Sequence, residues 1–142
     1  MREFVYAARF TADKKDGGFV VTFRDIPEAI TQSESHAECL EQAAGALQAA
    51  LEGRIMSSLD IPKASKAKRG EHLVAVPVQS ALKAALYLEM RQKGISRVEL
   101  ARRLRIDEKE ARRMLDPHHA TKADRLEKAL AVLGRYAELR VA

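Results

Sequence analysis

Two capping boxes in the last third of the chain constrain its fold more than any other feature. Ser96-x-x-Glu99 and Asp107-x-x-Glu110 each place a side-chain oxygen that can accept a hydrogen bond from the third amide of a helix, with a carboxylate that reaches back to the cap. The segment between the boxes has room only for one short helix and a tight turn at Arg105-Ile106. The sequence therefore predicts two short helices joined by a turn, which is the helix-turn-helix motif.

Two further helices should enclose this pair and supply most of its core. One is expected to begin near Ser80 and end at Gly94, and the other to be capped by Thr121 and to end at Gly134. All four helices carry apolar residues at helical spacing, so each has one apolar face. In chain order these residues are Leu82, Leu86 and Met90; Val98, Leu100 and Ala101; Ala111, Met114 and Leu115; Leu126, Ala129, Leu130 and Leu133. We therefore expect an all-α domain from residue 79 to 142.

The basic excess of the chain is concentrated in the same region. Residues 91 to 125 hold 11 Lys and Arg against 6 Asp and Glu, whereas the other residues hold 14 of each kind. A local positive charge on a helix-turn-helix is typical of a surface that meets the phosphates of nucleic acid. The alternative is a small helical bundle whose arginines only keep it in solution. The agreement of spacing, turn and charge favours DNA binding.

The second helix of such a motif enters the major groove by its N-terminal residues. Arginine can donate two hydrogen bonds to guanine, and glutamate can accept one from cytosine. The expected base-reading residues are Glu108, Lys109, Arg112 and Arg113. The expected phosphate contacts, at helix starts and in loops, are Ser96, Arg97, Arg105, His118, His119 and Lys122. Because Arg105 stands where many such motifs have Gly, we expect some strain in that turn.

The front of the chain has the pattern of a small sheet covered by one helix. Extended segments are expected at residues 4–11, 19–23 and 29–32, with a turn at Asp16-Gly17-Gly18 between the first two. A capping box at Ser35-x-x-Glu38 should start a helix that ends at Gly53. Residues 57–70 form a long loop by composition, and residues 72–78 form an extended run that must join this sheet. The expected inward residues of the helix are Leu40, Ala44, Leu47 and Leu51.

The resulting βββαβ order over residues 1–78 is shared with ribonuclease H-like domains, so nuclease activity has to be considered. Metal-dependent cleavage of a phosphodiester needs several carboxylates that converge on two ions. The candidate carboxylates lie mostly in turns or at a helix start, and none is mid-strand on a core face: Asp13, Asp16, Asp25, Glu28 and Glu38. His36 and His72 each stand alone. We therefore expect no catalytic residue, no metal site, no cofactor and no enzymatic activity.

Export and membrane signals are missing from the sequence. No apolar run approaches the roughly 18 residues of a membrane span, and the first residues lack a basic-then-apolar export pattern. Cys39 is the only cysteine, which excludes an internal disulfide. We expect a cytoplasmic protein.

The order of these parts resembles the HicB antitoxin family. The resemblance begins with the first strand, the segment from Asp16 to Val21, the segments 23–27 and 31–35, and the Ala-rich helix. It continues through Val76-Pro77-Val78, the long helix and the helix-turn-helix with Leu115-Asp116-Pro117-His118-His119, which is similar to the subgroup with a helical DNA-binding part. The resemblance covers nearly the whole chain.

The resemblance implies a degraded ribonuclease H-like domain without nuclease activity, which binds and neutralises a HicA-like, RNA-cleaving toxin. It also implies that the chain represses its own operon by binding operator DNA. We expect a homodimer whose recognition helices meet two half-sites, with higher-order assembly on the toxin as an open alternative. The alternating tail Glu138–Val141 is expected to pair as a strand with residues 76–78 or with a partner chain. Two rival functions stay open, a ligand-sensing repressor without a toxin partner and a nuclease.

Overall fold

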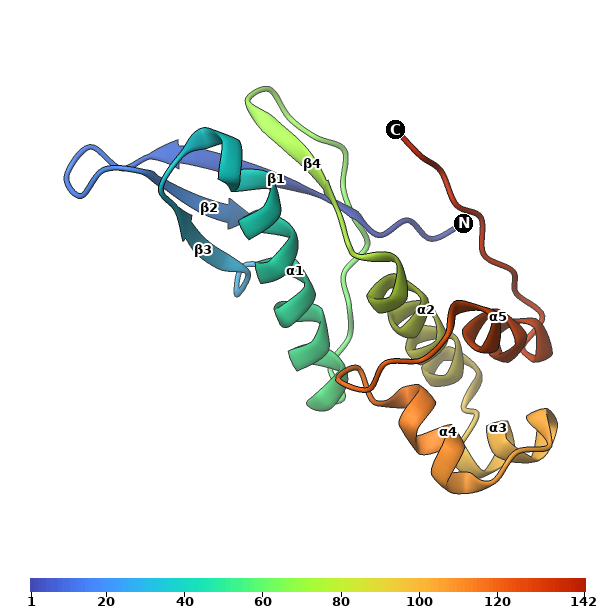
Figure 1. The fold of residues 1–142 in the computed structure, drawn as a ribbon. Helices are drawn as coiled ribbons and strands as arrows, with labels where there is room; N and C mark the ends of the chain where they lie inside the picture. The colour runs from blue at the N-terminus through green and yellow to red at the C-terminus, as the bar shows by residue number, and fades with distance from the viewer. The chain divides into compact units, whose positions relative to one another are not determined.

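The computed structural model describes all 142 residues of the chain, which divide into two compact units, Met1–Pro77 and Val78–Ala142. The first unit combines an antiparallel sheet with a helix, and the second is entirely helical (Figure 1). The expected α+β class is therefore confirmed.

The sheet of the first unit has four strands, β1 (Val5–Ala12), β2 (Phe19–Phe23), β3 (Ile30–Ser33) and β4 (Glu71–Ala75), in the order β3-β2-β1-β4. All neighbouring pairs are antiparallel. Directly opposite residues share a face, so the pairs Tyr6–Val74 and Ala8–Phe23 point to the same side, where all four side chains are buried. The expectation that the run after the long loop joins this sheet is confirmed.

The turn between β1 and β2 depends on Asp13 and two glycines. The Asp13 carboxylate accepts hydrogen bonds from the amides of Lys15 and Asp16 at 3.0 and 3.1 Å. Gly17 and Gly18 both have positive φ. A Cβ on Gly18 would lie 2.4 Å from the Ser33 carbonyl oxygen, so any side chain there would push β3 away from the turn.

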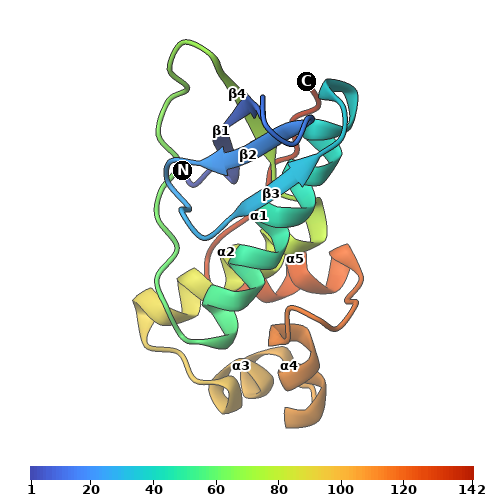
Figure 2. The same ribbon diagram turned by 90° about the vertical axis from the view of Figure 1, so that its left-hand side faces the viewer.

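One helix, α1 (Cys39–Met56), follows a single 3-10 turn at His36–Glu38 and covers one face of the sheet (Figures 1 and 2). Ser35 accepts a hydrogen bond from the Glu38 amide, as the capping box predicts. The buried stripe is Cys39, Ala43, Leu47 and Leu51, so Leu47 and Leu51 were predicted correctly. Leu40 is 55% exposed and Ala44 is only half-buried, because Cys39 and Ala43 take the two inward positions.

The helix also continues past Gly53, contrary to expectation, and ends at Met56. The left-handed residue that stops it is Ser58, with φ 56°, rather than the glycine. The amides of Ser57, Ser58 and Leu59 then donate to carbonyls of the last turn. Gly53 is an ordinary helical residue whose missing side chain faces open space.

Residues 57–70 form no helix or strand, as expected, and they carry the chain back along α1 before it enters β4 (Figure 1). A direct helix-to-strand connection would bring β4 in parallel to β1, as in a βαβ unit. Residues 57–70, which we call the return segment, reverse the direction of the chain, so β4 is antiparallel to β1. Ile61 is buried, and the carbonyl of Pro62 accepts a hydrogen bond from the Tyr6 hydroxyl at 2.7 Å.

The helical unit consists of α2 (Val78–Lys93), α3 (Arg97–Leu104), α4 (Glu108–Leu115) and α5 (Ala123–Val132). Gly94 ends α2 with φ 65°, as predicted.

Two details of the helical unit differ from expectation. Lys122 rather than Thr121 is the N-cap residue of α5, and its side chain makes no capping hydrogen bond, whereas Thr121 is buried one residue earlier. Val98 is 60% exposed, since the inward positions of the eight-residue α3 are taken by Leu100 and Ala101. The core consists of Leu82, Leu86, Met90, Leu100, Met114, Leu126, Ala129, Leu130 and Leu133.

Residues 135–142 form neither helix nor strand. The expected strand pairing of the tail within the chain is therefore not seen. No helix is both long enough and apolar enough to cross a membrane.

Candidate functional site

The N-cap half of each capping box in the helical unit forms as predicted, but the carboxylates do not reach back to the cap amides. Glu99 accepts from Arg102 and Arg103 instead, and Glu110 accepts from Arg125. The Ser96 hydroxyl accepts from the Glu99 amide at 3.1 Å, and the Asp107 carboxylate accepts from the Glu110 amide at 2.9 Å. Between them Arg105 has the left-handed conformation, φ 55° and ψ 44°, and the Ile106 amide returns to the Ala101 carbonyl at 3.1 Å. An arginine in this conformation costs on the order of 1 kcal/mol. The expected strain at Arg105 is thus present.

Helix α4 presents a basic outer face. Ala111 and Met114 are buried, whereas Lys109, Arg112 and Arg113 are exposed and their side chains make no hydrogen bond or ion pair. Three free cations on one short helix are available to an external anion or to base edges.

Glu108, which was expected to read bases, is paired with a residue that was expected to contact phosphate. Arg97 at the start of α3 lies 3.0 Å from the Glu108 carboxylate. The structure therefore brings these two predicted site residues together. The ion pair neutralises the negative charge of Glu108 at the amino end of α4, which would otherwise repel phosphates.

A second ion pair of this kind was missed by the sequence-based reasoning. Arg125 on α5 lies 3.2 Å from Glu110, which is also in the first turn of α4. Arginines from α3 and α5 thus each hold one acidic residue of α4. No sequence spacing signals the second contact, because it joins two helices across the loop between them.

The other predicted phosphate contacts are exposed. The Ser96 hydroxyl already accepts from the Glu99 amide as the cap of α3, and the residue is exposed. His118 and His119 lie in the loop after α4, where the His118 amide donates to the Asp116 carboxylate at 2.9 Å. Lys122 directly precedes α5. These residues surround α4 but do not form one pocket.

Glu99 has a structural role on the outer surface of α3. It accepts hydrogen bonds from Arg102 and Arg103, and these lower the pKa of its carboxyl to about 2. The carboxylate therefore stays charged in all ordinary conditions and neutralises part of the arginine charge of its own helix.

Lys83 on α2 is a charged residue inside the helical unit, with only 3% of its surface exposed. Its ammonium group donates to the main-chain carbonyls of Arg113, at 3.3 Å, of Asp116, at 2.6 Å, and of His119. All three acceptors lie at the carboxyl end of α4 or in the loop after it. The signal in the sequence was a lysine on the apolar face of a helix, at helical spacing from Leu86 and Met90.

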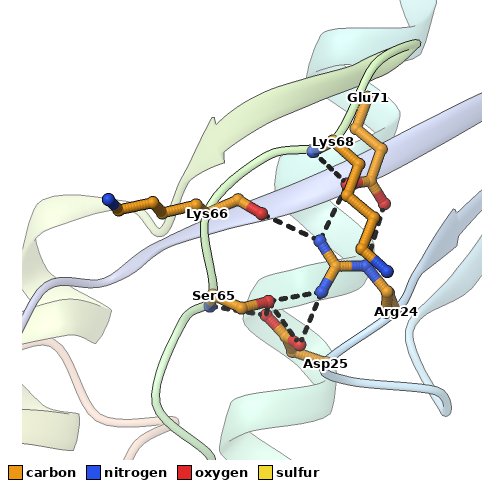
Figure 3. Close-up of polar contacts among 6 residues, drawn as sticks. All are labelled: Arg24, Asp25, Ser65, Lys66, Lys68 and Glu71. Carbon is orange, nitrogen blue, oxygen red and sulfur yellow. Dashed lines mark hydrogen bonds and ion pairs between the residues drawn. The ribbon is translucent and has the colours of Figure 1, made fainter.

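The first unit holds a polar cluster around Arg24, which we call the Arg24 clamp and define as Arg24, Asp25, Ser65, Lys66, Lys68 and Glu71 (Figure 3). The Arg24 guanidinium makes a two-pronged contact with Glu71, at 2.8 and 3.1 Å, and also donates to the Ser65 hydroxyl and the Lys66 carbonyl. Asp25 accepts from the Ser65 amide at 2.8 Å. The clamp ties the return segment to the end of β2 and to β4.

The charge state of Glu71 follows from this clamp. Hydrogen bonds from Arg24 and from the Lys68 amide lower the pKa of the Glu71 carboxyl to about 2, and the same contact raises the pKa of Arg24. Burial of the Glu71 side chain works in the opposite direction but is outweighed.

The carboxylates considered for catalysis do not converge. Asp13 holds the first turn, Asp25 belongs to the Arg24 clamp, and Glu28 is paired with Arg54. No group of three or more His, Cys, Asp or Glu side chains is placed to hold a metal ion.

The two histidines expected to stand alone are in fact neighbours. His36 and His72 have ring centroids 5.9 Å apart, and His72 stacks on Phe10 at 4.5 Å. Sequence distance concealed this contact, because the pairing of β4 with β1 brings His72 to Phe10, which also contacts His36 in the 3-10 turn.

Comparison with known proteins matches most of the chain. Residues 5–85 match the family model for the HicB-like antitoxin of bacterial toxin–antitoxin systems. The antitoxin HicB of Escherichia coli strain K12 is 38% identical over 120 residues, which cover 84% of this chain and 87% of that protein. The antitoxin HicB 2 of Photorhabdus laumondii subsp. laumondii is 37% identical over 134 residues, 94% of each chain. The antitoxin HicB 1 of the same organism is 32% identical over 127 residues, 89% of this chain and 81% of that protein.

Proposed function

Since this chain belongs to the HicB-like family of antitoxins, which are not enzymes, we propose that it neutralises a HicA-like toxin and represses its own operon. The toxin would be a small protein that cleaves mRNA. We assign toxin binding to residues 1–78 and DNA binding to residues 79–142. The observation that carries the second assignment is the α3–α4 pair, whose outer helix exposes Lys109, Arg112 and Arg113 without partners.

For the first unit we propose a degraded ribonuclease H-like domain that acts by binding. The βββαβ order supports this proposal, and so do the carboxylates, which serve as caps and ion-pair partners instead of gathering around a metal. Its charged side chains are near balance, which suits a contact with another protein better than a contact with RNA.

For the second unit we propose that α4 is the recognition helix. Lys109, Arg112 and Arg113 would read base edges in the major groove. Glu108 would share that role only when Arg97 swings from it to a phosphate. Ser96, Arg97, Arg105, His118, His119 and Lys122 would contact the phosphates on either side.

We further propose that the chain binds its operator as a homodimer, because two-fold symmetric half-sites need two recognition helices about one helical turn apart. The exposed apolar tail, with Tyr136, Leu139 and Val141, is the segment that a second copy would cover. Deletion of residues 137–142 should lower both the solution mass and the operator affinity. An unchanged mass by light scattering would remove the tail from the dimer.

Co-expression with the adjacent gene tests the whole assignment. The chain should co-purify with a short basic protein whose expression alone stops growth, and should shift a duplex taken from upstream of its own gene. DNA binding without any toxic neighbour would instead favour a ligand-sensing repressor. Metal-dependent RNA cleavage by the purified chain would favour a nuclease. If the chain binds no DNA, its membership of the antitoxin family still holds, but the proposed repressor role is wrong.

A further inference from the structure

A buried lysine that donates to three main-chain carbonyls is unusual inside so small a unit. Removing an ammonium group from water is costly unless each of its donors finds an acceptor. Lys83 meets this requirement with the carbonyls of Arg113, Asp116 and His119, which come from the end of α4 and from the loop after it. Arg113 lies in the last turn of α4, where carbonyls lack a full set of partners within the helix, and Asp116 is the C-cap residue. The Arg113 and Asp116 carbonyls also accept from the main-chain amides of Asp116 and His119.

The electrostatics of the contact favour a cation at that place. The carboxyl end of a helix carries a partial negative charge, so a positive group there stabilises it. Lys83 comes from α2, a different helix, and therefore fixes the position of α4 relative to α2. A cap from within α4 could not do this.

The acceptors of Lys83 belong to the proposed DNA-binding surface. Arg113 is one of the exposed cations of α4, and His119 follows His118 in the loop that flanks it. One ammonium group therefore holds the main chain of two neighbouring elements whose side chains face outward. Recognition sites need their supporting groups held to within about 0.5 Å.

We propose that Lys83 is a positioning residue for DNA recognition, which sets the angle of α4 and the place of the 116–119 loop without touching DNA. This inference rests on the proposed function, since it needs α4 to be the recognition helix. It assigns a role in specificity to a residue with 3% of its surface exposed, which no search of the molecular surface would select.

Lys93 provides a matched control within the same helix. It is also a lysine of α2 that donates to a carbonyl at the end of another helix, but its acceptor is Leu133 after α5. Lys83→Met and Lys93→Met therefore each remove an ammonium group from a carbonyl at a helix end, the first from α4 and the second from α5. Lys93 also pairs with Glu89 at 3.4 Å and its side chain is 41% exposed, so the control variant additionally loses an ion pair.

The test measures affinity for two labelled duplexes by fluorescence anisotropy. One is the upstream duplex that the wild-type chain protects from DNase I, and the other is a scrambled duplex of equal length. Lys83→Met should reduce affinity for the protected duplex by about tenfold, the loss of roughly one base contact. Its affinity for the scrambled duplex should change much less. Lys93→Met should keep the wild-type ratio of the affinity for the protected duplex to the affinity for the scrambled duplex. Both variants should still bind the toxin.

Folding is checked by circular dichroism, and Lys83→Gln, which keeps a donor but loses the charge, is measured in parallel in case Lys83→Met does not fold. A folded Lys83 variant with wild-type discrimination between the duplexes overturns the inference. An equal loss of discrimination in Lys93→Met at equal stability also overturns it, because the effect would then come from general loosening. A wild-type chain that protects no duplex overturns the proposed repressor function itself, before any variant is compared.

Discussion

The two units of this chain use charged side chains for opposite purposes. Residues 1–77 hold 10 Lys and Arg against 11 Asp and Glu, whereas residues 78–142 hold 15 against 9. In the first unit the main ion pairs connect distant segments, as Arg24 does with Glu71 and Arg54 with Glu28. In the second unit the ion pairs neutralise acidic residues and leave Lys109, Arg112 and Arg113 without partners.

The difference shows how one chain can serve two kinds of partner. A unit with balanced charge and internally satisfied ion pairs offers little attraction to nucleic acid, so it is suited to a protein partner. A unit with unpaired arginines on one helix has a surface that polyanions can reach. Four predictions, from the largest expected effect to the smallest, test how far this separation holds.

Loss of core packing in one unit should leave the function of the other intact. Leu86 is fully buried in the helical core, so Leu86→Ala should cost about 2 to 5 kcal/mol of stability. We expect operator binding to be lost in a mobility-shift assay and toxin co-purification to remain. Leu47→Ala, in the core of the first unit, should have the reverse effect. The assignment of one function to each unit is wrong if either variant loses both operator binding and toxin co-purification.

Removal of one unpaired cation should weaken only specific DNA binding. Arg112→Ala should reduce the free energy of operator binding by about 1 to 3 kcal/mol and relax the preference for one base pair. Lys14→Ala removes the same charge from the exposed β1–β2 turn and is the control. Titration of labelled operator by fluorescence anisotropy measures both variants. Equal losses would mean that net charge matters and the position on α4 does not.

Removal of the central cation of the Arg24 clamp should release the return segment. Arg24→Ala deletes all contacts of the guanidinium to Glu71, Ser65 and Lys66. Residues 57–70 contain Lys63, Lys66, Lys68 and Arg69, so trypsin should cleave there several-fold faster than in the wild-type chain. Lys14→Ala serves again as the control. Operator binding should not change. A cleavage rate equal to wild type would show that the rest of the sheet holds the segment.

Acid should affect the two low-pKa glutamates differently. The pKa of Glu71 and that of Glu99 are both lowered to about 2, below the ordinary value of 4.5. Each carboxylate therefore stabilises the folded chain above about pH 4.5, and this contribution is lost as the pH falls towards 2. In thermal melts between these pH values, the melting temperature of Glu71→Gln should depend less steeply on pH than that of the wild type. Glu99→Gln should change this pH dependence less. Its partners Arg102 and Arg103 lie on the same exposed helix, and such local surface pairs contribute little to stability. An equal change for both would contradict the distinction between long-range and local pairs.

Local signals predicted most of the fold but failed where a contact joins distant segments. The N-cap hydrogen bonds of the three capping boxes, the turn at Arg105 and the helix stop at Gly94 depend on neighbouring residues, and all are present. Leu40 was assigned wrongly because spacing alone allows either Leu40 or Cys39 on the inward face, and the sheet covers Cys39. Gly53 was assigned wrongly because the helix ends at a left-handed Ser58, which residue type does not signal.

The candidate site shows the same limit. The exposed positions of α4 follow from helical periodicity, so their identity could be predicted. The pairing of Glu108 with Arg97 and the burial of Lys83 depend on how the helices pack, and periodicity carries no information on that. Lys83 would have been found only by asking why a lysine stands on an apolar face.

The return segment also determines the order in which the chain can fold. Since β1 pairs with β4 from Val5–Ala75 to Arg9–Glu71, the sheet cannot be completed until nearly all of the first unit has left the ribosome. Until then one edge of β1 is open to proteases and to other strands. The helical unit also packs its first helix, α2, against its last, α5, but helices form from local contacts, so it should fold faster than the sheet. A cell that stops translation would therefore hold a population of new chains in which the sheet, and with it the proposed toxin-binding unit, is still unfinished.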